Sequence, residues 1–203
     1  GGRPLIGAAV AAEIELDFER RRGRNVLARL DLDGLEAGEG RPPLVIGAHV
    51  DGLGRGETSG SLARGDERGR LHPGADDNAS GVAALIEVAQ ALAAATDAGG
   101  LDGAARDVIF AAWSGEELGL LGSEHFVDAL AEAQGAEDLA DAVSAYVNMD
   151  MVGRMEDRVV VGGLGSSPIW EREIERRNAV VGLPIVTSQD PYLPTDATSF
   201  YLK

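Results

Sequence analysis

The residues best suited to chemistry begin with the stretch HPGADDNASGVAALIEVAQAL, from His72 to Leu92. Asp76, Asp77 and Asn78 stand in a row directly before an apolar helical pattern, and no Lys or Arg is close by in sequence. Such side chains can bind the free amide groups of a helix start, where the helix dipole also favours negative charge. Alternatively, one of the carboxylates holds a cation. This stretch alone is compatible with both interpretations.

Three further polar clusters follow short apolar runs. They are His49-Val50-Asp51, Ser114-Gly115-Glu116-Glu117 and Asn148-Met149-Asp150. Taken singly, each has an ordinary explanation, such as a half-buried His at a strand end or acids that compensate a helix dipole. Taken together, they contain several carboxylates and no Lys or Arg, and burying unpaired carboxylates is costly. A divalent cation would supply the missing charge, and mixed His, Asp and Glu ligands suit Zn²⁺.

The segments around these clusters alternate between strand and helix patterns. Short apolar runs predict strands over 44–49, 107–113, 144–153 and 158–163, and apolar residues at helical spacing predict helices over 82–92, 117–133 and 168–180. This alternation predicts an α/β fold with a mostly parallel mixed central sheet and helices on both faces. In such folds the site lies beyond the carboxyl ends of the strands, where all four polar clusters would converge.

Two segments stand outside this alternation. Residues 11–32 form two alternating runs around a turn at 20–24 and predict a β-hairpin or edge strands. Residues 51–70 are polar and rich in glycine, and a loop this long within a compact domain is usually functional or disordered.

Composition limits the partners. The 203 residues carry a net charge of −16, which argues against binding to nucleic acid or to anionic lipid. The chain has no Cys and only three His, so carboxylates must dominate any metal site. No apolar run is long enough to cross a bilayer, and no charged and then apolar leader opens the chain, so we expect no membrane segment.

At this point the chain resembles a known family. VIGAHVDGLG, HPGADDNASGVAALIEVAQAL, AAWSGEELGLLGSEHFV and NMDMVGR are similar, in order and spacing, to the motifs of the zinc aminopeptidases of peptidase family M28. The resemblance runs from about Val45 to Lys203 and implies the zinc-exopeptidase (phosphorylase/hydrolase-like) fold. It divides the chain into a catalytic domain over 25–203 and lead-in strands over 1–24, which resemble the tail of a protease-associated insert domain.

The resemblance also implies a role for each polar residue. The metal ligands would be His49 and Asp150 on one zinc ion, Asp77 bridging two, and Glu117 on the second. Glu116 would be the general base for a water that bridges the two zinc ions, and Asp51 would be the carboxylate that fixes the imidazole of His49. The family also places a cis peptide bond between the residues matching Asp77 and Asn78. The expected reaction is removal of the N-terminal residue of a peptide with a free N-terminus.

The chain departs from the family pattern in two places. The last ligand of the family is a His downstream of the segment matching LPTDATSFYLK, and neither His72 nor His125 fits that role. We therefore expect a catalytic domain that is incomplete at its C-terminus, with reduced activity and one favoured metal position built from His49, Asp77 and Asp150. Where family members often carry Ser-Asp-His, this chain has Thr195-Asp196-Ala197, and Asp196 is expected to support the site without ligating.

Two alternatives stay open beside the aminopeptidase. One is a single-zinc enzyme of the same fold, such as a glutaminyl cyclase, and the other is a non-catalytic binding domain of that fold. The family resemblance further suggests a secreted or periplasmic protein.

Overall fold

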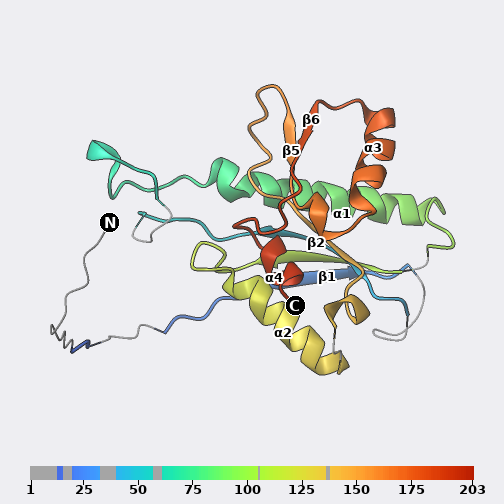
Figure 1. Ribbon diagram of the computed structural model, residues 1–203, viewed down its shortest axis with the longest axis horizontal. Helices are drawn as coiled ribbons and strands as arrows, with labels where there is room; N and C mark the ends of the chain where they lie inside the picture. Colours follow the sequence, from blue (N-terminus) through green and yellow to red (C-terminus); the bar gives the residue numbers. More distant parts are fainter. Residues whose placement is uncertain (1–12, 16–19, 33–39, 57–60, 105, 136–137) are drawn as a thin grey trace, which may run out of the picture.

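The central sheet holds the carboxyl ends of its parallel strands together. A computed structural model of the chain describes residues 13–15, 20–32, 40–56, 61–104, 106–135 and 138–203. Within these residues the sheet has the order β1-β3-β2-β4 (Figure 1), with β1 at Val26–Leu30, β2 at Leu44–His49, β3 at Val108–Trp113 and β4 at Ala145–Asn148. Strand β2 is parallel to both β3 and β4, whereas β1 is antiparallel to β3. The predicted mixed, mostly parallel sheet is confirmed.

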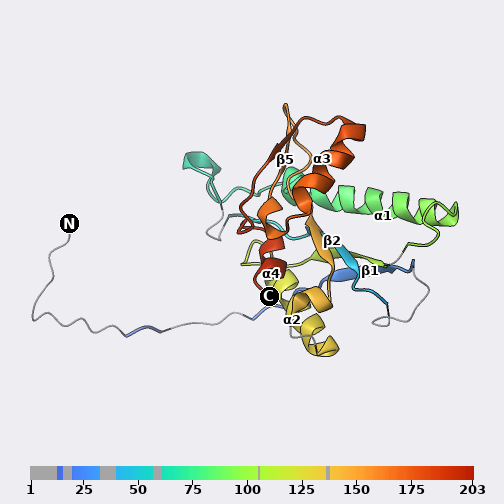
Figure 2. The same cartoon turned by 45° about the vertical axis from the view of Figure 1, so that its right-hand side comes forward.

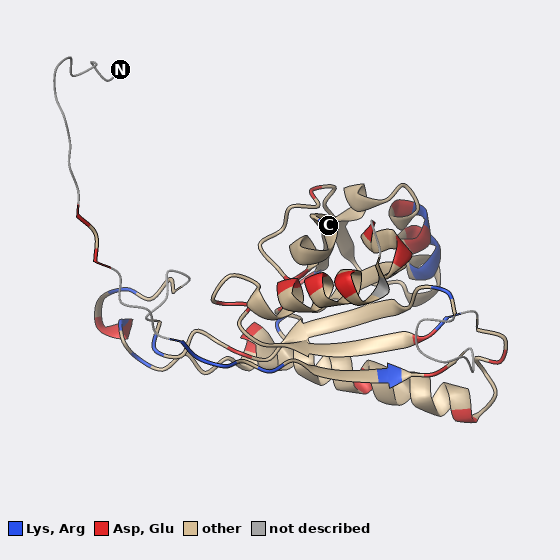
Figure 3. Cartoon of the chain, turned by 90° about the horizontal axis from the view of Figure 1, so that it is seen from below, with Lys and Arg blue, Asp and Glu red and all other residues tan. Residues whose placement is uncertain are grey.

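Helices cover both faces of this sheet, as predicted. Helix α1 (Gly81–Asp97) lies on one face, and α2 (Leu121–Gln134) with the short α4 (Ala197–Tyr201) lies on the other (Figures 1 and 2). Seen from below, α1 and α2 lie on opposite sides of the strands (Figure 3). Two hydrophobic clusters result, one on each face of the sheet.

The two clusters follow from the alternation of side chains along each strand. Ile46 and Ala48 of β2 pack with Phe110 of β3 and with Leu85 of α1. Val45, the residue before Ile46, joins a cluster on the opposite face that contains Ala111, Trp113 and Val127. Because β2 and β3 are covered on both faces, their sequences are continuous apolar runs rather than alternating ones. Such runs predict buried strands.

An aromatic cluster supports the end of the sheet that carries the polar residues. Trp113 is fully buried, packs its ring 5.1 Å from that of Phe126, and donates its indole N–H to the hydroxyl of Tyr146 at 2.9 Å. The ring of Tyr146 stacks on that of Phe200 at 3.9 Å. Since Trp113 is the register partner of His49, this cluster fixes the base of the predicted site.

The predicted fourth strand belongs elsewhere. Strand β5 (Val159–Val161) does not join the central sheet but pairs in parallel with β6 (Ile185–Thr187), a short strand that the sequence pattern did not predict. Helix α3 (Trp170–Val181) connects the two strands, as a parallel crossover requires. The prediction was wrong about the pairing because a run of three Val residues does not specify its partner strand.

Other boundaries differ by a few residues. Helix α2 begins at Leu121 instead of 117, because residues 116–120 form a turn in which Gly119 and Leu120 both donate their amides to the carbonyl of Glu116. The third predicted strand ends at Asn148 instead of Gly153. Much of the predicted N-terminal hairpin lies outside the described residues; residues 13–15 and 20–25 form no strand, and only the second run forms one, β1.

Helix α1 is an apolar helix of the core. Contrary to the expectation from the sequence, residues 75–97 are long and apolar enough to cross a membrane, by length and composition alone. In this structure, however, Val82, Leu85, Ala89 and Leu92 pack against the central sheet. The helix therefore has the role that the sequence pattern predicted, covering one face of the sheet and presenting its N-terminus at the carboxyl ends of the strands (Figure 1).

Candidate metal centre

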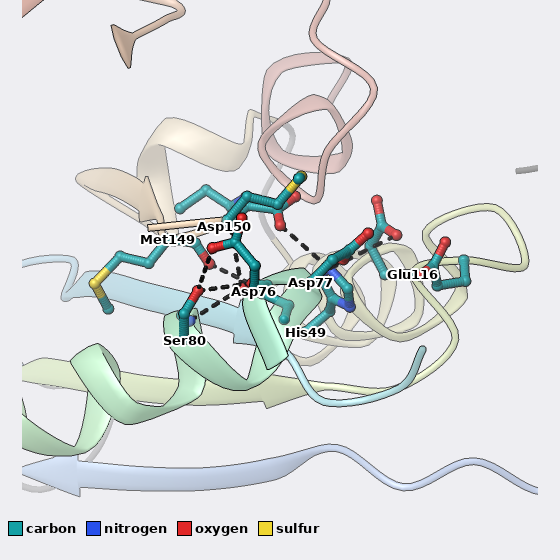
Figure 4. Close-up of polar contacts among 12 residues, drawn as sticks. His49, Asp76, Asp77, Ser80, Glu116, Met149 and Asp150 are labelled. Carbon is teal, nitrogen blue, oxygen red and sulfur yellow. Dashed lines mark hydrogen bonds and ion pairs between the residues drawn. The ribbon is translucent and has the colours of Figure 1, made fainter. Parts of the chain in front are cut away.

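His49 is the last residue of β2 and lies at the centre of the site. The strands on either side of β2, which are β3 and β4, run parallel to it. The segments that follow these three strands therefore leave the sheet at the same edge. The turn before α1 brings Asp77 to this edge from a fourth segment (Figure 4). The His49 side chain is 1% exposed, which places the imidazole in a buried position with its Nε2 atom facing the carboxylates.

Three side chains at this edge form a cluster suited to a metal ion. The Nε2 atom of His49 lies 3.1 Å from Oδ1 of Asp77 and 3.4 Å from Oδ1 of Asp150. One ligand atom from each of the three residues lies within 4.8 Å of the other two. Ligands about 2.1 Å from a tetrahedral zinc ion are about 3.4 Å from one another. The spacing of His49 from both carboxylates therefore fits a shared zinc ion.

The electrostatics of the cluster indicate a missing positive charge. Among the residues that the structure describes, no Lys or Arg lies within ion-pair distance of Asp77, Glu116 or Asp150. Burial acts to lower the pKa of His49, but the carboxylates of Asp150, Glu116 and Asp51 outweigh it and raise the pKa to about 9. The nearby carboxylates thus favour a positive charge between them so strongly that, without a metal cation, they favour the protonated imidazole.

Glu116 faces the same centre but is held differently. Its Oε2 atom lies 4.0 Å from Nε2 of His49, and its side chain is 12% exposed. Burial raises the pKa of Glu116 to about 7, against the effect of His49 and with added repulsion from nearby acids. A carboxylate whose pKa lies near 7 and which stands beside a metal position has the properties of a general base.

Asp51 positions the turn that carries Glu116. Its Oδ1 accepts the backbone amide of Glu116 at 3.1 Å, and its Oδ2 accepts that of Glu117 at 3.2 Å. The Nδ1 atom of His49 lies 3.3 Å from the backbone carbonyl oxygen of Asp51 and 3.8 Å from its carboxylate. The predicted contact to the imidazole is therefore made by the carbonyl of Asp51, while the carboxylate fixes the adjacent glutamates.

Several buried oxygens at the site have no hydrogen-bond partner among the described residues. They are Oε1 of Glu117, Oδ1 of Asp150 and both carboxylate oxygens of Asp196. Burial, together with the charge of Asp77, raises the pKa of Glu117. Glu117 is not part of the three-residue cluster. Unpaired buried carboxylate oxygens are unfavourable in a protein interior, and a divalent cation is the group that this donor set fits.

The structure also reveals residues that sequence reasoning missed. Asn78, Asp76 and Ser80 bind the segment after β4 through the backbone of residues 149–153 (Figure 4). Asn78 in addition accepts the amide of Gly81 at 3.0 Å, so it caps α1 as one of the two initial interpretations proposed. The Asp77–Asn78 peptide bond is cis, as the resemblance implied. The order of residues in the stretch Asp76-Asp77-Asn78 did not by itself distinguish the expected ligand, Asp77, from the neighbours that support it.

An open hollow borders the centre on the side of the long loop. It has a volume of about 450 Å³, and Asp51 and Asp77 lie on its wall. Val50, Pro73 and Val82 give it an apolar lining. His72 also lines the hollow and is 3.0 Å from the hydroxyl of Ser61, which agrees with a structural role for this His.

Comparison with known proteins agrees with this geometry. An aminopeptidase of Pseudomonas aeruginosa is 34% identical over 110 residues, which are 54% of this chain and 15% of that protein. A probable lipoprotein aminopeptidase of Mycobacterium tuberculosis is 30% identical over 131 residues, which are 64% of this chain and 20% of that protein. The chain therefore spans a fifth or less of the length of these two relatives.

Solved structures share the fold. BSAP, a zinc aminopeptidase from Bacillus subtilis, gives a TM-score of 0.61 at 24% identity over 88% of this chain and 37% of its own. Porphyromonas gingivalis glutaminyl cyclase gives a TM-score of 0.58 at 17% identity over 87% of this chain and 58% of its own. The sequence model of peptidase family M28 matches residues 25–201, which include every residue of the centre. This chain belongs to peptidase family M28.

Proposed function

We propose that this chain carries the catalytic centre of a metal-dependent aminopeptidase. The observation that carries the proposal is the group of His49, Asp77 and Asp150 at the spacing of zinc ligands, with the Glu116 carboxylate 4.0 Å from the same imidazole nitrogen. Aminopeptidase activity is also supported by the two relatives, which are described as an aminopeptidase and a probable lipoprotein aminopeptidase. Zinc is the proposed metal, with His49, Asp77 and Asp150 as one position and Glu117 beside Asp77 as a ligand of a second.

The proposed chemistry divides between the cation and the protein. A divalent cation bound there would polarise the carbonyl of the scissile peptide bond and lower the pKa of water. Glu116 accepts a proton from the attacking water and returns it to the amine nitrogen as the C–N bond breaks, so that the carboxylate is regenerated. Asp51 holds the backbone of Glu116 and keeps this carboxylate aimed at the centre.

The substrate is proposed to be a peptide with a free N-terminus. Its ammonium group would be attracted by the surplus of carboxylates, since the described residues offer them no Lys or Arg. The hollow beside Asp51 and Asp77 gives an apolar side chain of the peptide a place next to the centre. We further propose a location outside the cytoplasm, which the lipoprotein aminopeptidase among the relatives supports.

The test is hydrolysis of an aminoacyl-nitroanilide by the protein with and without a chelator. We expect release of nitroaniline that stops on chelation and returns with zinc, and no release from the N-acetylated substrate. Wild-type protein that hydrolyses the substrate equally well in chelator would contradict the proposal, and so would one that prefers the blocked substrate.

A glutaminyl cyclase is the second candidate. It is favoured by the likeness of fold and by the fact that the described part of the chain offers one three-residue metal position rather than two. Elemental analysis of the zinc-loaded protein and an assay with an N-terminal glutaminyl peptide separate the two. Cyclisation of that peptide without hydrolysis of aminoacyl substrates would replace the aminopeptidase proposal.

A further inference from the structure

The two carboxylates of the metal cluster are carried by segments that the sheet does not hold together. Asp77 precedes helix α1, whereas Asp150 follows β4. The ladder between β2 and β4 ends where Met149 donates its amide to the carbonyl of Gly47 at 2.9 Å. Beyond that bond, another interaction must set the position of Asp150 relative to Asp77.

The side-chain amide of Asn78 provides that interaction. Its Nδ2 donates to the carbonyl of Met149 at 3.0 Å, and its Oδ1 accepts the amide of Met151 at 3.2 Å. These two peptide groups flank Asp150 on either side, while Asn78 itself is bonded to Asp77. Asn78 is 3% exposed, so the bonds are shielded from competing water. One buried amide thus links both ligands, using donor and acceptor at once.

Two neighbours of Asn78 extend the attachment along the same segment. Ser80 Oγ accepts the amide of Val152 at 3.1 Å, and Asp76 Oδ1 accepts that of Gly153 at 2.9 Å. Three successive backbone N–H groups, those of residues 151–153, therefore bind side chains of residues 76–80. The paired residues are 71 to 77 positions apart in sequence.

The two segments are also in close steric contact. A Cβ atom on Gly81 would lie 2.4 Å from the carbonyl oxygen of Met149, and one on Gly153 would lie 2.7 Å from Cβ of Ser80. Met151 has a φ of 49°, a conformation unfavourable for a residue with a side chain. Such a conformation persists where the surroundings fix the backbone, as the bonds of Asn78 and its neighbours do here.

We propose that Asn78 is a positioning residue of the metal centre, which sets the separation of the Asp77 and Asp150 carboxylates. This inference rests on the proposed metal-binding function and adds a residue to it. When the two ligands are already in position, cation binding carries no free-energy cost of ordering the segment that holds them. Substitution of supporting residues of this kind typically changes metal affinity 10- to 100-fold. The same range, about 10- to 100-fold weaker zinc binding, is expected when Asn78 is truncated.

The test compares zinc affinity, measured by competition with a chromophoric chelator, in wild type, Asn78→Ala and Asn78→Asp. The Ala variant loses all three hydrogen bonds and should show the full loss of affinity. The Asp variant keeps the acceptor oxygens but not the donor, and the cobalt-substituted protein should show an altered visible spectrum in both variants. If Asn78→Ala does not fold, the nearly isosteric Asp variant decides.

Asn178 offers a matched control. Its amide also donates to one backbone carbonyl and accepts one backbone amide, both of Leu183, at 2.8 and 2.9 Å. It lies at the end of helix α3, away from the metal cluster in sequence and among exposed residues. Asn178→Ala should lower stability without changing zinc affinity or the cobalt spectrum.

Gly81→Ala approaches the same question by sterics. It removes no polar group of residues 76–80, but its Cβ would clash with the side-chain amide of Asn78 and with the carbonyl oxygen of Met149. The contact between these two groups must therefore shift, so zinc affinity should again fall. Wild-type affinity and spectrum in both Asn78→Ala and Gly81→Ala would overturn the positioning role and leave the metal centre intact. Wild-type protein that binds no zinc would overturn the proposed function as well, so the two failures are distinguishable.

Discussion

The acidic side chains of this protein occur in two contrasting regions. At the carboxyl ends of β2, β3 and β4 the carboxylates face one imidazole, and the described residues place no Lys or Arg among them. By contrast, Glu173 of helix α3 pairs with Arg176, and Asp157, just before β5, pairs with Arg158. Figure 3 shows acidic and basic residues next to one another along α3.

The pKa values of the two regions shift in opposite directions. Hydrogen bonds from Arg176 and Arg158 lower the pKa of Glu173 and of Asp157. Burial raises the pKa of Glu116 to about 7. Glu173 and Asp157 are thus paired with the protein's own cations, whereas the described residues offer no Lys or Arg to the acids that face His49. That asymmetry is what a binding site for an external cation requires, because a resident Arg would compete with the metal.

The largest effect that tests this contrast is expected from Glu116→Gln. The amide is nearly isosteric but cannot take a proton, so hydrolysis of aminoacyl-nitroanilides should fall by roughly 10²- to 10⁴-fold. Zinc affinity should stay within a few-fold, since Glu116 lies outside the three-residue cluster. Steady-state kinetics and zinc competition together measure the two quantities. Unchanged kcat with weakened zinc binding would make Glu116 a ligand and not a base.

Metal binding should stabilise the fold only through the carboxylates around His49, which we call the acidic region. Zinc at a free concentration of 100 times its Kd should raise the free energy of unfolding by about 2.7 kcal/mol. Urea denaturation with zinc and with chelator measures the difference. Asp150→Asn should remove most of the gain, whereas Glu173→Gln should leave it intact. A gain that survives Asp150→Asn would place the cation elsewhere.

Sequence reasoning located the acidic region because its determinants are local. The apolar runs of β2 and β3 and the helical spacing of α1 each specify an element, and parallel strands bring their carboxyl ends to one edge. The convergence of the four polar clusters follows from those elements, whereas the choice of His49, Asp77 and Asp150 among the residues of these clusters came from the family resemblance. The cis peptide bond came from the family resemblance, not from a local pattern.

Contacts between distant segments could not be predicted in the same way. The attachment of Asn78 to residues 149–153 consists of bonds to backbone groups, which leave no mark in the side-chain pattern. Strand β6 has three residues, too few for a period to be recognised, and so its pairing with β5 was missed. The family resemblance implied a contact between the carboxylate of Asp51 and the imidazole of His49, and that carboxylate lies 3.8 Å from Nδ1. Its bonds to the backbone amides of Glu116 and Glu117 were not predicted, because they too are made to backbone groups.

A smaller effect than metal binding is expected from Asp196→Asn in the metal-free protein. Asp196 is fully buried, and burial raises its pKa from 3.8 to about 6. Since the folded pKa lies above the unfolded one, ionisation destabilises the fold: the penalty is absent below about pH 4 and complete above about pH 6. The amide removes it, so the variant should be more stable than wild type at pH 8, by at most about 3 kcal/mol.

The pH dependence is the decisive part of that measurement. Urea denaturation at pH 8 should favour Asp196→Asn, and the difference should shrink toward zero as the pH falls to about 4. A constant difference across this range would mean that the substitution acts through packing instead of charge. Destabilisation at pH 8 would show that the ionised carboxylate has a partner, and the contrast between the two regions would not extend to Asp196.

The smallest effect is expected in the paired region, from Glu173→Gln. Arg176 is exposed and Glu173 is partly exposed, and ion pairs at the surface contribute little because water and salt screen them. The lowered pKa of Glu173 means that its small contribution exists above the ordinary pKa of Glu and disappears as the pH falls through the folded value. The melting temperatures of variant and wild type should therefore coincide at pH 7 in physiological salt, and equally at pH 3. A clear loss at pH 7 would show that the surface acids also carry stability, and that pairing alone does not separate the two regions.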